Sequence, residues 1–481
     1  MSSAELNHLH ALGTFLLSAE IPHFYPDDPD YTALQASYTS NPAKPAVIIR
    51  PRSAEDVAEV VQFCSSNSSS TANGSMPCVI RAGGHDLAGR HTVADAVQID
   101  LRLLDSVAIS PDKKTARIGG GILLDALLTA LEKEGLTTVV GGIGTVGYVG
   151  WATFGGYGDS VPGRGLGCDQ IVAAKVVNAE GCIQEASGQM LKAIRGGGPG
   201  NWGVITELTI KIYPLQEIQA GMIIFDPSDL RGSISTYLTN YASLVRTEQV
   251  PTSLYLQPMV FNLLGMGTVF MVSFVWTGST IGDDNCKKWQ AKIAGLANCI
   301  QQTVATTTPL KKLMDTTAML PLQVHGGTHT VTLGEYSAQA VAALVEVALS
   351  MPKDLGCGLS IHALQPCSPS SLKESKENEE EESVYNCRQP HMMLELVGFG
   401  TTEEAGLEGM NWAAEARAML SGVDAALDWT YFSLAHPDHV DLNKMYTAED
   451  YEVMKGLKKE VDPKGVFRYA LPQVTSIASA R

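Results

Sequence analysis

Residues 79–90 read VIRAGGHDLAGR and place a single histidine, His85, behind two glycines at the end of a short apolar run. The apolar run predicts a strand, and Gly83 and Gly84 predict a loop at its end. A histidine in such a loop is a hydrogen-bonded structural residue, a catalytic base or the point at which another group is attached. The choice depends on the rest of the chain, which determines the fold that carries the loop.

The residues around this loop alternate between strand and helix patterns. An apolar run at 46–51 ends on a proline, and Ser53 then precedes apolar residues at helical spacing. Strand patterns follow at 78–84 and 96–101, and a helix pattern at 122–135 ends on a glycine. The first part of the chain therefore predicts an α/β arrangement.

A glycine-rich tract separates this part from the next. Residues 141–167, GGIGTVGYVGWATFGGYGDSVPGRGLG, contain so many glycines that neither a helix nor a strand is predicted to run through them unaided. From residue 215 glycine is rarer, and long apolar strands alternate with amphipathic helices near 335–350 and 404–420. This change predicts a second domain of the α+β class. Further on, the stretch DWTYFSL at 428–434 has a strand-like pattern.

Composition and charge exclude several classes of function. The chain has 481 residues, enough for more than one core, and it carries 51 acidic against 34 basic residues, a net charge of -17. This charge repels phosphate backbones and anionic lipid head groups, so no nucleic-acid or membrane partner is predicted. We find no signal peptide and no apolar run long enough to span a bilayer, which predicts a cytoplasmic protein. Nine scattered cysteines without a CxxC pair predict reduced thiols.

Other motifs are weak. GIGTVG at 142–147 and GPGNWG at 198–203 match GxGxxG, but neither lies between a strand and a helix as a Rossmann fingerprint requires. The glycine loops instead offer unhindered backbone N–H groups to a large phosphate-bearing ligand. The histidine pairs at 325/329 and 436/439 have no obvious third ligand nearby, so no metal site is predicted.

Four segments together resemble a known family. They are RAGGHDLAG (81–89), IGTVGYVGWATFGGYG (143–158), IRGGGPGNWGVIT (194–206) and DPKGVFRYALPQ (462–473). In this order they resemble the FAD-linked oxidases of the vanillyl-alcohol oxidase type, in the berberine-bridge-enzyme-like branch. The resemblance implies an α+β fold, in which a PCMH-type FAD-binding domain of two α/β subdomains is joined to a substrate domain with a helix-covered antiparallel sheet. The implied boundaries are an N-terminal segment 1–41, the FAD domain 42–214, the substrate domain 215–425 and a segment 426–481 that returns to the FAD domain.

The resemblance also implies how FAD is held. The family histidine, which bonds through its ring to the flavin 8α-carbon, falls on His85, whereas Ile143 replaces the cysteine that makes a second flavin bond in many members. One covalent link is therefore expected, 8α-N-histidyl, with no cysteinyl link. Val146 falls where a valine leaves room for O2, which favours an oxidase. The expected FAD-binding residues are Ala82, Gly83, Gly84, His85, Asp86, Gly142, Thr145, Val146, Gly147, Gly150, Gly155, Gly203, Val204 and Ile205.

The expected activity follows from the same resemblance. The family segment YxNY corresponds to YFSL, so Tyr431 is the candidate catalytic residue, as base or substrate orienter; the alternative is a tyrosine of the core. We expect an oxidase that transfers a hydride from a small organic substrate, such as an alcohol, a hydroxylated ring or a secondary-metabolite intermediate, to the flavin. O2 then reoxidises the flavin and H2O2 is released. The alternatives are an FAD-dependent dehydrogenase or oxidative cyclase, and a non-catalytic flavin-binding protein.

Overall fold

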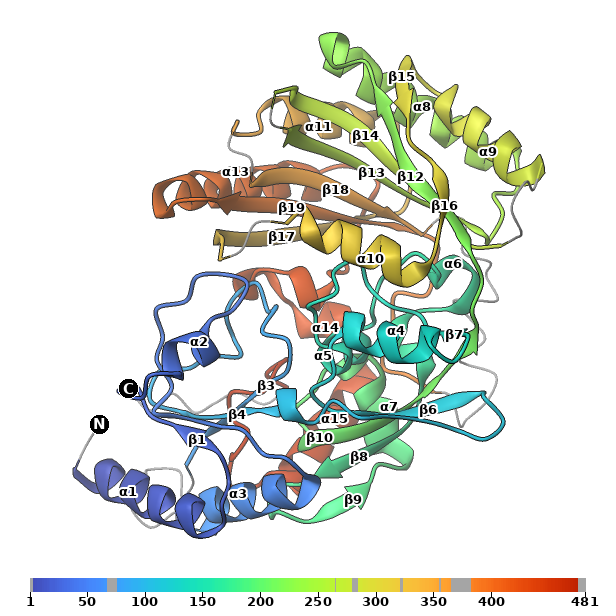
Figure 1. Cartoon of the computed structure of the whole chain (residues 1–481). Coiled ribbons are helices and arrows are strands. Elements are labelled where there is room, and N and C mark those ends of the chain that lie inside the picture. Colours follow the sequence, from blue (N-terminus) through green and yellow to red (C-terminus); the bar gives the residue numbers. More distant parts are fainter. Residues whose placement is uncertain are drawn as a thin grey trace.

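The structure is a computed structural model that describes residues 3–66, 76–263, 265–278, 284–320, 323–353, 356–364 and 382–474. One region, drawn below in Figure 1, contains a four-stranded sheet, a five-stranded sheet, the two-stranded pair of β7 (Leu136–Thr137) and β11 (Tyr213–Pro214), and the glycine loops. The other contains one large sheet. Among the described residues, no helix has the length and apolar character needed to cross a bilayer.

The loop that carries His85 leaves one end of a four-stranded sheet. In spatial order its strands are β1 (His23–Phe24), β2 (Val47–Ile49), β4 (Val97–Asp100) and β3 (Cys78–Arg81). Strands β2, β4 and β3 are parallel, so their carboxyl ends share one edge. The predicted helix is α3 (Ala54–Ser66), and the N–H of Asp56 donates to the Ser53 hydroxyl at its start. Its apolar side packs on β2 and β4 in one core.

A second sheet of five strands lies beside the first. In order it contains β5 (Val107–Ile109), β6 (Thr115–Gly119), β10 (Val204–Lys211), β8 (Ile171–Val177) and β9 (Ile183–Glu185), with α4 (Leu124–Glu132) and α7 (Gly188–Gly197) packed nearby. As predicted, neither a helix nor a strand runs through 141–167, but two short helices, α5 (Tyr148–Thr153) and α6 (Val161–Arg164), interrupt the tract. Tertiary packing supplies the missing support: the buried Trp151 indole in α5 donates to the Tyr157 carbonyl at 3.1 Å.

The large sheet is antiparallel throughout. Its path runs β15 (Cys299–Gln302), β12 (Ile218–Phe225), β14 (Gly267–Trp276), β13 (Leu254–Leu263), β18 (Cys357–Ala363), β19 (Met392–Gly400), β17 (His325–Leu333) and β20 (Ala426–Leu427), and β16 (Ala305–Thr307) also pairs with β12. One face packs against α8 (Leu230–Thr247), α9 (Asp284–Ala294), α11 (Ala338–Leu349) and α13 (Glu403–Ser421). The other face lies toward the glycine loops (Figure 1). The predicted α+β class is confirmed.

Successive side chains of β19 point to opposite faces of the large sheet, and the two sets differ in polarity. Leu394 and Leu396 belong to the core under the helices, and Glu395 between them projects to the opposite face. A single charged residue in an apolar strand thus marks the face that meets the glycine loops.

After β20 the chain returns to the first sheet. It passes through η6 (Phe432–Leu434), η7 (Pro437–His439), α14 (Leu442–Met445) and α15 (Ala448–Val461), and the Cys78 N–H in β3 donates to the Val466 carbonyl at 2.9 Å. The predicted strand at 428–434 is wrong, because pairing stops at Leu427. Beyond it the Thr328 hydroxyl, rather than a strand, donates to the Leu434 carbonyl at 2.6 Å. The domain boundaries at 42, 215 and 426 stay predictions.

Candidate active site

Two loops that lie sixty residues apart in the sequence meet backbone against backbone. A Cβ placed on Gly147 would lie 2.7 Å from the Gly83 nitrogen and 2.8 Å from the Ala82 Cβ. A Cβ on Gly83 would lie 2.7 Å from the Thr145 carbonyl oxygen. Real Cβ atoms do not approach other atoms so closely, so glycine is required on both sides. The loop after β3 and the loop before α5 therefore form one structure.

The first of these loops presents unused backbone donors. In the described part of the chain, no N–H from Gly83 to Asp86 donates a hydrogen bond. Gly84 has a φ of +74°, a conformation that glycine adopts without strain. Consecutive free N–H groups in such a turn form a concave site for an anion. The Asp86 carboxylate does not occupy this site, because it accepts from Arg90 Nε at 2.8 Å.

A buried arginine holds the loop from behind. Arg81, the last residue of β3, donates to the carbonyl oxygens of Leu34 and Gln35 at 2.6 and 3.0 Å and also to that of Ala36. These carbonyls end the short helix α2 (Tyr31–Gln35). Burial lowers the pKa of the Arg81 guanidinium to about 10, which still leaves it charged at neutral pH. The charged Arg81 guanidinium therefore lies next to the loop with the free N–H groups, and its positive charge favours the binding of an anion there.

His85 bridges the two loops. Its Nε2 lies 2.7 Å from the Thr145 hydroxyl, and its ring stacks on Tyr38 with centroids 4.8 Å apart. Burial, and secondarily the charge of Arg81, lowers the pKa of His85 to about 4, so the imidazole is neutral at pH 7. Among the described residues, Nδ1 has no hydrogen-bond partner. A neutral imidazole with one nitrogen held and the other available is a nucleophile.

Two glycines of the second loop, Gly142 and Gly150, border open space in the described structure. A Cβ on Gly142 or on Gly150 would meet no atom within 4 Å. Neither glycine has a positive φ, so neither is required by backbone geometry. Val146 is half-buried beside them. Glycines that no protein contact demands are typical of a surface against which a ligand lies closely.

Part of this loop is held from the other region of the molecule. Helix α10 (Pro309–Ala318) follows β16, and its Thr317 hydroxyl accepts from the Gly144 N–H at 2.7 Å. Lys312 of the same helix pairs with Asp159 at 2.6 Å. Both regions therefore determine the shape of the loop that contacts His85.

The remaining predicted FAD-binding residues lie in packed surroundings. Gly155, with φ +117°, is closed by the ring of Tyr385, and Gly203, with φ +128°, is closed by Val176 and Val177. Val204 and Ile205 begin β10, and their side chains are buried in the cores of the four-stranded and five-stranded sheets. Their backbones, and not their side chains, remain available to a ligand.

Tyr431 lies in a buried group of aromatic residues. Its ring is 4.6 Å from that of Tyr157, which hydrogen-bonds to Tyr385 at 2.8 Å and to His391 Nε2 at 2.7 Å. Burial raises the pKa of Tyr431 above that of an exposed phenol, so its hydroxyl keeps its proton. This environment favours orientation of a substrate over proton abstraction.

A carboxylate that no sequence motif indicated faces the same space. Glu395 Oε2 lies 3.5 Å from His362 Nε2, and His362 Nδ1 lies 2.8 Å from the Tyr255 hydroxyl. Burial and the charge of Glu395 together raise the pKa of Tyr38 to about 12, and Tyr38 is the residue that stacks on His85. Glu395 thus lies on the sheet face that meets the His85 loop. The only signal in the sequence was its isolated charge within an apolar strand.

The chain is similar to known flavin-dependent proteins. A family model described as an FAD binding domain matches residues 45–187. The chain is 34% identical over 455 residues to the FAD-linked oxidoreductase aurO of Gibberella zeae, covering 92% of this chain and 83% of that protein.

Solved structures share the fold. The 6-hydroxy-D-nicotine oxidase of Arthrobacter nicotinovorans superposes with a TM-score of 0.80 at 23% identity, over 93% of this chain and 96% of that one. Berberine bridge enzyme from Eschscholzia californica superposes with a TM-score of 0.77 at 18% identity, over 97% and 98% of the two chains.

Proposed function

Because this chain belongs to the FAD-linked oxidoreductases of the vanillyl-alcohol oxidase type, in the berberine-bridge-enzyme-like branch, we propose that it is an oxidase with a single covalent bond between FAD and His85. Its class, an FAD-dependent oxidoreductase that acts on a small molecule, follows from the family. The oxidase activity, the His85 bond and the site residues are the proposal.

The geometry of His85 is the observation that carries the proposal. Its imidazole is neutral, it is fixed between Thr145 and Tyr38, and it adjoins the free N–H groups of its own loop. These residues fit FAD, because the N–H groups suit a pyrophosphate and the open positions at Gly142 and Gly150 suit a flat ligand pressed against the backbone. Ala82, Gly83, Gly84, Asp86, Val146 and Gly147 complete the proposed contacts, with Gly155, Gly203, Val204 and Ile205 contributing backbone only.

The residues on the opposite side supply acid–base chemistry. When bound, FAD accepts a hydride equivalent from a substrate C–H bond and passes the electrons to O2, which becomes H2O2. Glu395 is the proposed acceptor of the substrate hydroxyl or amine proton, because it is the carboxylate on the sheet face beside Tyr38 and His85. His362, held by Tyr255, fixes the carboxylate, and Tyr431 donates a hydrogen bond that orients the substrate.

Two residues favour this proposal over a doubly attached flavin and over a dehydrogenase or oxidative cyclase. Ile143 offers no thiol, so the proposed flavin is attached once. Val146 is a small residue beside Gly147, and it supports access of O2 to the ring. A dehydrogenase or cyclase would need the same cofactor loops, but its reduced flavin would persist in air.

The test uses the purified yellow protein. After acid precipitation the flavin is expected to stay in the pellet, and the intact mass is expected to exceed that of the chain by one FAD. His85→Ala should release the flavin into the supernatant, whereas Cys286→Ser, which removes a buried thiol in α9 on the helix side of the large sheet, should not. Reduced protein mixed with air should regain its oxidised spectrum and produce H2O2. Flavin in the wild-type supernatant contradicts the covalent bond, and slow reoxidation contradicts the oxidase.

A further inference from the structure

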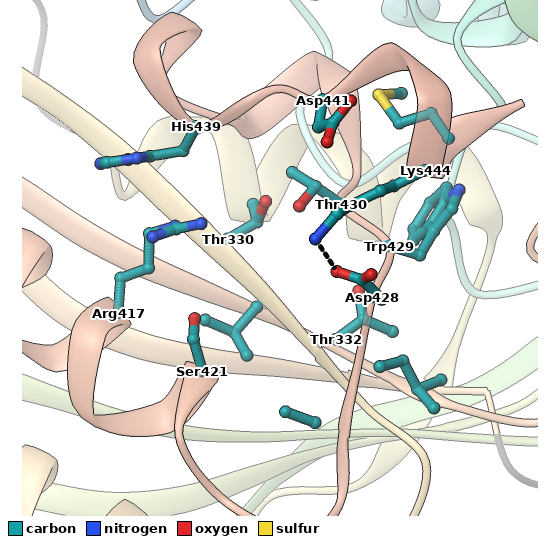
Figure 2. A pocket seen from close by; sticks show the side chains of 14 residues that line it. Thr330, Thr332, Arg417, Ser421, Asp428, Trp429, Thr430, His439, Asp441 and Lys444 are labelled. Carbon is teal, nitrogen blue, oxygen red and sulfur yellow. Dashed lines mark hydrogen bonds and ion pairs between the residues drawn. The ribbon is translucent and has the colours of Figure 1, made fainter.

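A cavity of about 450 Å³ opens at the edge of the large sheet, where β17 meets the last part of the chain. Figure 2 shows its wall, which is formed by β17, the end of α13, residues 426–430 and the segment that includes η7 and α14. A cavity of this size holds a small organic molecule. None of its lining residues belongs to the loops around His85.

Arg417 of α13 supplies a cation to the cavity wall. Its Nε is buried and, in the part of the chain that the structure describes, finds no hydrogen-bond partner and no carboxylate at ion-pair distance. Figure 2 shows its guanidinium directed into the cavity, between His439 and Thr330. Arg417 is half-buried, and an unpaired guanidinium whose Nε is buried is typical of a site that a ligand completes.

Two buried hydroxyls face the same cavity. Thr330 and Thr332 of β17 are 2% and 0% exposed, and the Oγ1 of each lacks a partner among the described residues. A threonine hydroxyl that is buried is normally hydrogen-bonded. The guanidinium and the two hydroxyls thus offer several donors to one ligand.

The carboxylates of the wall are already engaged. Asp428 pairs with Lys444 at 2.5 Å, as the dashed line in Figure 2 marks. Asp441 accepts from the N–H of Asn443 at 3.1 Å, at the start of α14. Among the described residues, neither carboxylate forms an ion pair with Arg417.

Three histidines cluster beside this cation. His329, from the first histidine pair, stacks on His436 and lies tilted against His439 of the second pair, with ring centroids 5.0 and 5.1 Å apart. The neighbouring rings and Arg417 contribute to lowering the pKa of His329 to about 4, although burial is the larger cause. Asp438 is the acidic group close to the cluster, and its side chain is 81% exposed. The described residues contain no group of three His, Cys, Asp or Glu side chains arranged to hold a metal ion.

Part of the remaining wall is apolar. Trp429, Val331, Leu427 and Met445 line it. Trp429 also separates the cavity from the aromatic residues of the candidate active site, since its ring lies 5.2 Å from Tyr385 and 6.5 Å from Tyr431. A ligand in the cavity would contact Trp429 on the side that faces away from Tyr431.

The geometry points to a second binding site, for an organic carboxylate whose anionic end is held by Arg417, Thr330 and Thr332 and whose apolar body lies against Trp429. A planar carboxylate matches the two-pronged donor arrangement of a guanidinium. The site lies outside the proposed FAD contacts and does not depend on them.

Calorimetric titration of the yellow protein with sodium benzoate tests this inference, with inorganic phosphate titrated in parallel. Benzoate should bind without changing the visible flavin spectrum, and Arg417→Gln should weaken the binding by about tenfold or more, since it removes a charge-assisted hydrogen bond. Thr330→Val, which keeps the shape of the side chain, should also weaken it. Arg231→Gln is the matched control, because Arg231 is exposed and pairs with Glu346 on the helix side of the sheet.

Several results would overturn the site. They are the absence of benzoate binding, equal binding in the wild type and in both cavity variants, a flavin spectral change that persists in Arg417→Gln, and phosphate binding as tight as that of benzoate. Thermal midpoints of all variants verify folding, and the Thr330→Val result decides the matter if Arg417→Gln is unstable.

Discussion

Gly83 and Gly147 touch through their backbones, so that a methyl group on either one would collide with the other loop. This contact lets a segment after β3 and a segment before α5 form a single surface, and it explains why glycine recurs in both.

Gly83→Ala is expected to separate the loops. The added methyl would overlap Thr145 and Gly147, so the free energy of unfolding should fall by about 1–3 kcal/mol and flavin should be lost. Chemical denaturation and the flavin-to-protein ratio measure the two effects. Gly456→Ala is the control: its Cβ meets nothing within 4 Å in α15, so it should stabilise by up to about 1 kcal/mol. A Gly83→Ala protein as stable and as yellow as the wild type would refute the contact.

Gly150→Ala should separate cofactor binding from stability. Gly150 lies in α5 and a methyl there meets no protein atom, so flavin-free protein should keep or slightly raise its thermal midpoint. If FAD lies against this glycine, the variant should be purified with less flavin. Unchanged flavin content would place the ring elsewhere.

Glu395→Gln should slow turnover about 10²–10⁴-fold while flavin attachment and thermal midpoint stay as in the wild type, because an amide cannot accept the substrate proton. Tyr431→Phe should slow it about tenfold, the cost of one neutral hydrogen bond, since the raised pKa of Tyr431 leaves no phenolate to lose. Anaerobic flavin reduction with a turned-over substrate gives both rates. Glu404→Gln, an exposed change in the first turn of α13, is the control. A Glu395→Gln protein with wild-type reduction rates would remove this residue from the chemistry.

Stability should fall in mild acid through buried histidines. Burial lowers the pKa of His391 to about 4, below its ordinary value of 6.5, so between these values the unfolded chain binds a proton that the folded chain does not. Stability therefore rises with pH across this window and is lost as pH falls, by about 1 kcal/mol per such histidine from pH 7.5 to 5.5. In urea unfolding at both pH values, His391→Gln should lose less stability than the wild type. Parallel losses would exclude His391 as a source.

Arg388→Met should be strongly destabilising. Arg388 is buried, pairs with Asp169 at 2.8 Å, and attaches the segment before β19 to the loop before β8. Removing Arg388 leaves the half-buried Asp169 carboxylate without its counter-ion, which costs about 3 kcal/mol. Arg231→Met breaks an exposed pair and should cost about 1 kcal/mol or less. Equal denaturation midpoints for the two variants would contradict this difference.

The sequence predicted best what depends on local constraint. The glycine loops and His85 were recognisable because few residues satisfy a close backbone approach, and the geometry at Gly83, Gly84 and Gly147 is of that kind. The helix α3 was predicted from Ser53 and its apolar spacing for the same local reason.

Features created by long-range pairing escaped prediction. Glu395, His362 and Tyr255 lie on three different strands, and only the register of β13, β18 and β19 brings them together. The strand expected at 428–434 failed because Thr328, a hundred residues earlier, competes for the Leu434 carbonyl. Likewise, α5 forms inside a glycine-rich tract because of the buried indole of Trp151.

The hydrogen bond from Gly144 to Thr317 has a consequence for biosynthesis. When only the first 214 residues have been synthesised, Thr317, whose hydroxyl accepts from this N–H, is not yet present. Lys312, which pairs with Asp159, is also missing. The loop that contacts His85 therefore gains its final support late in translation. A chain that ends before Lys312 lacks both of these contacts.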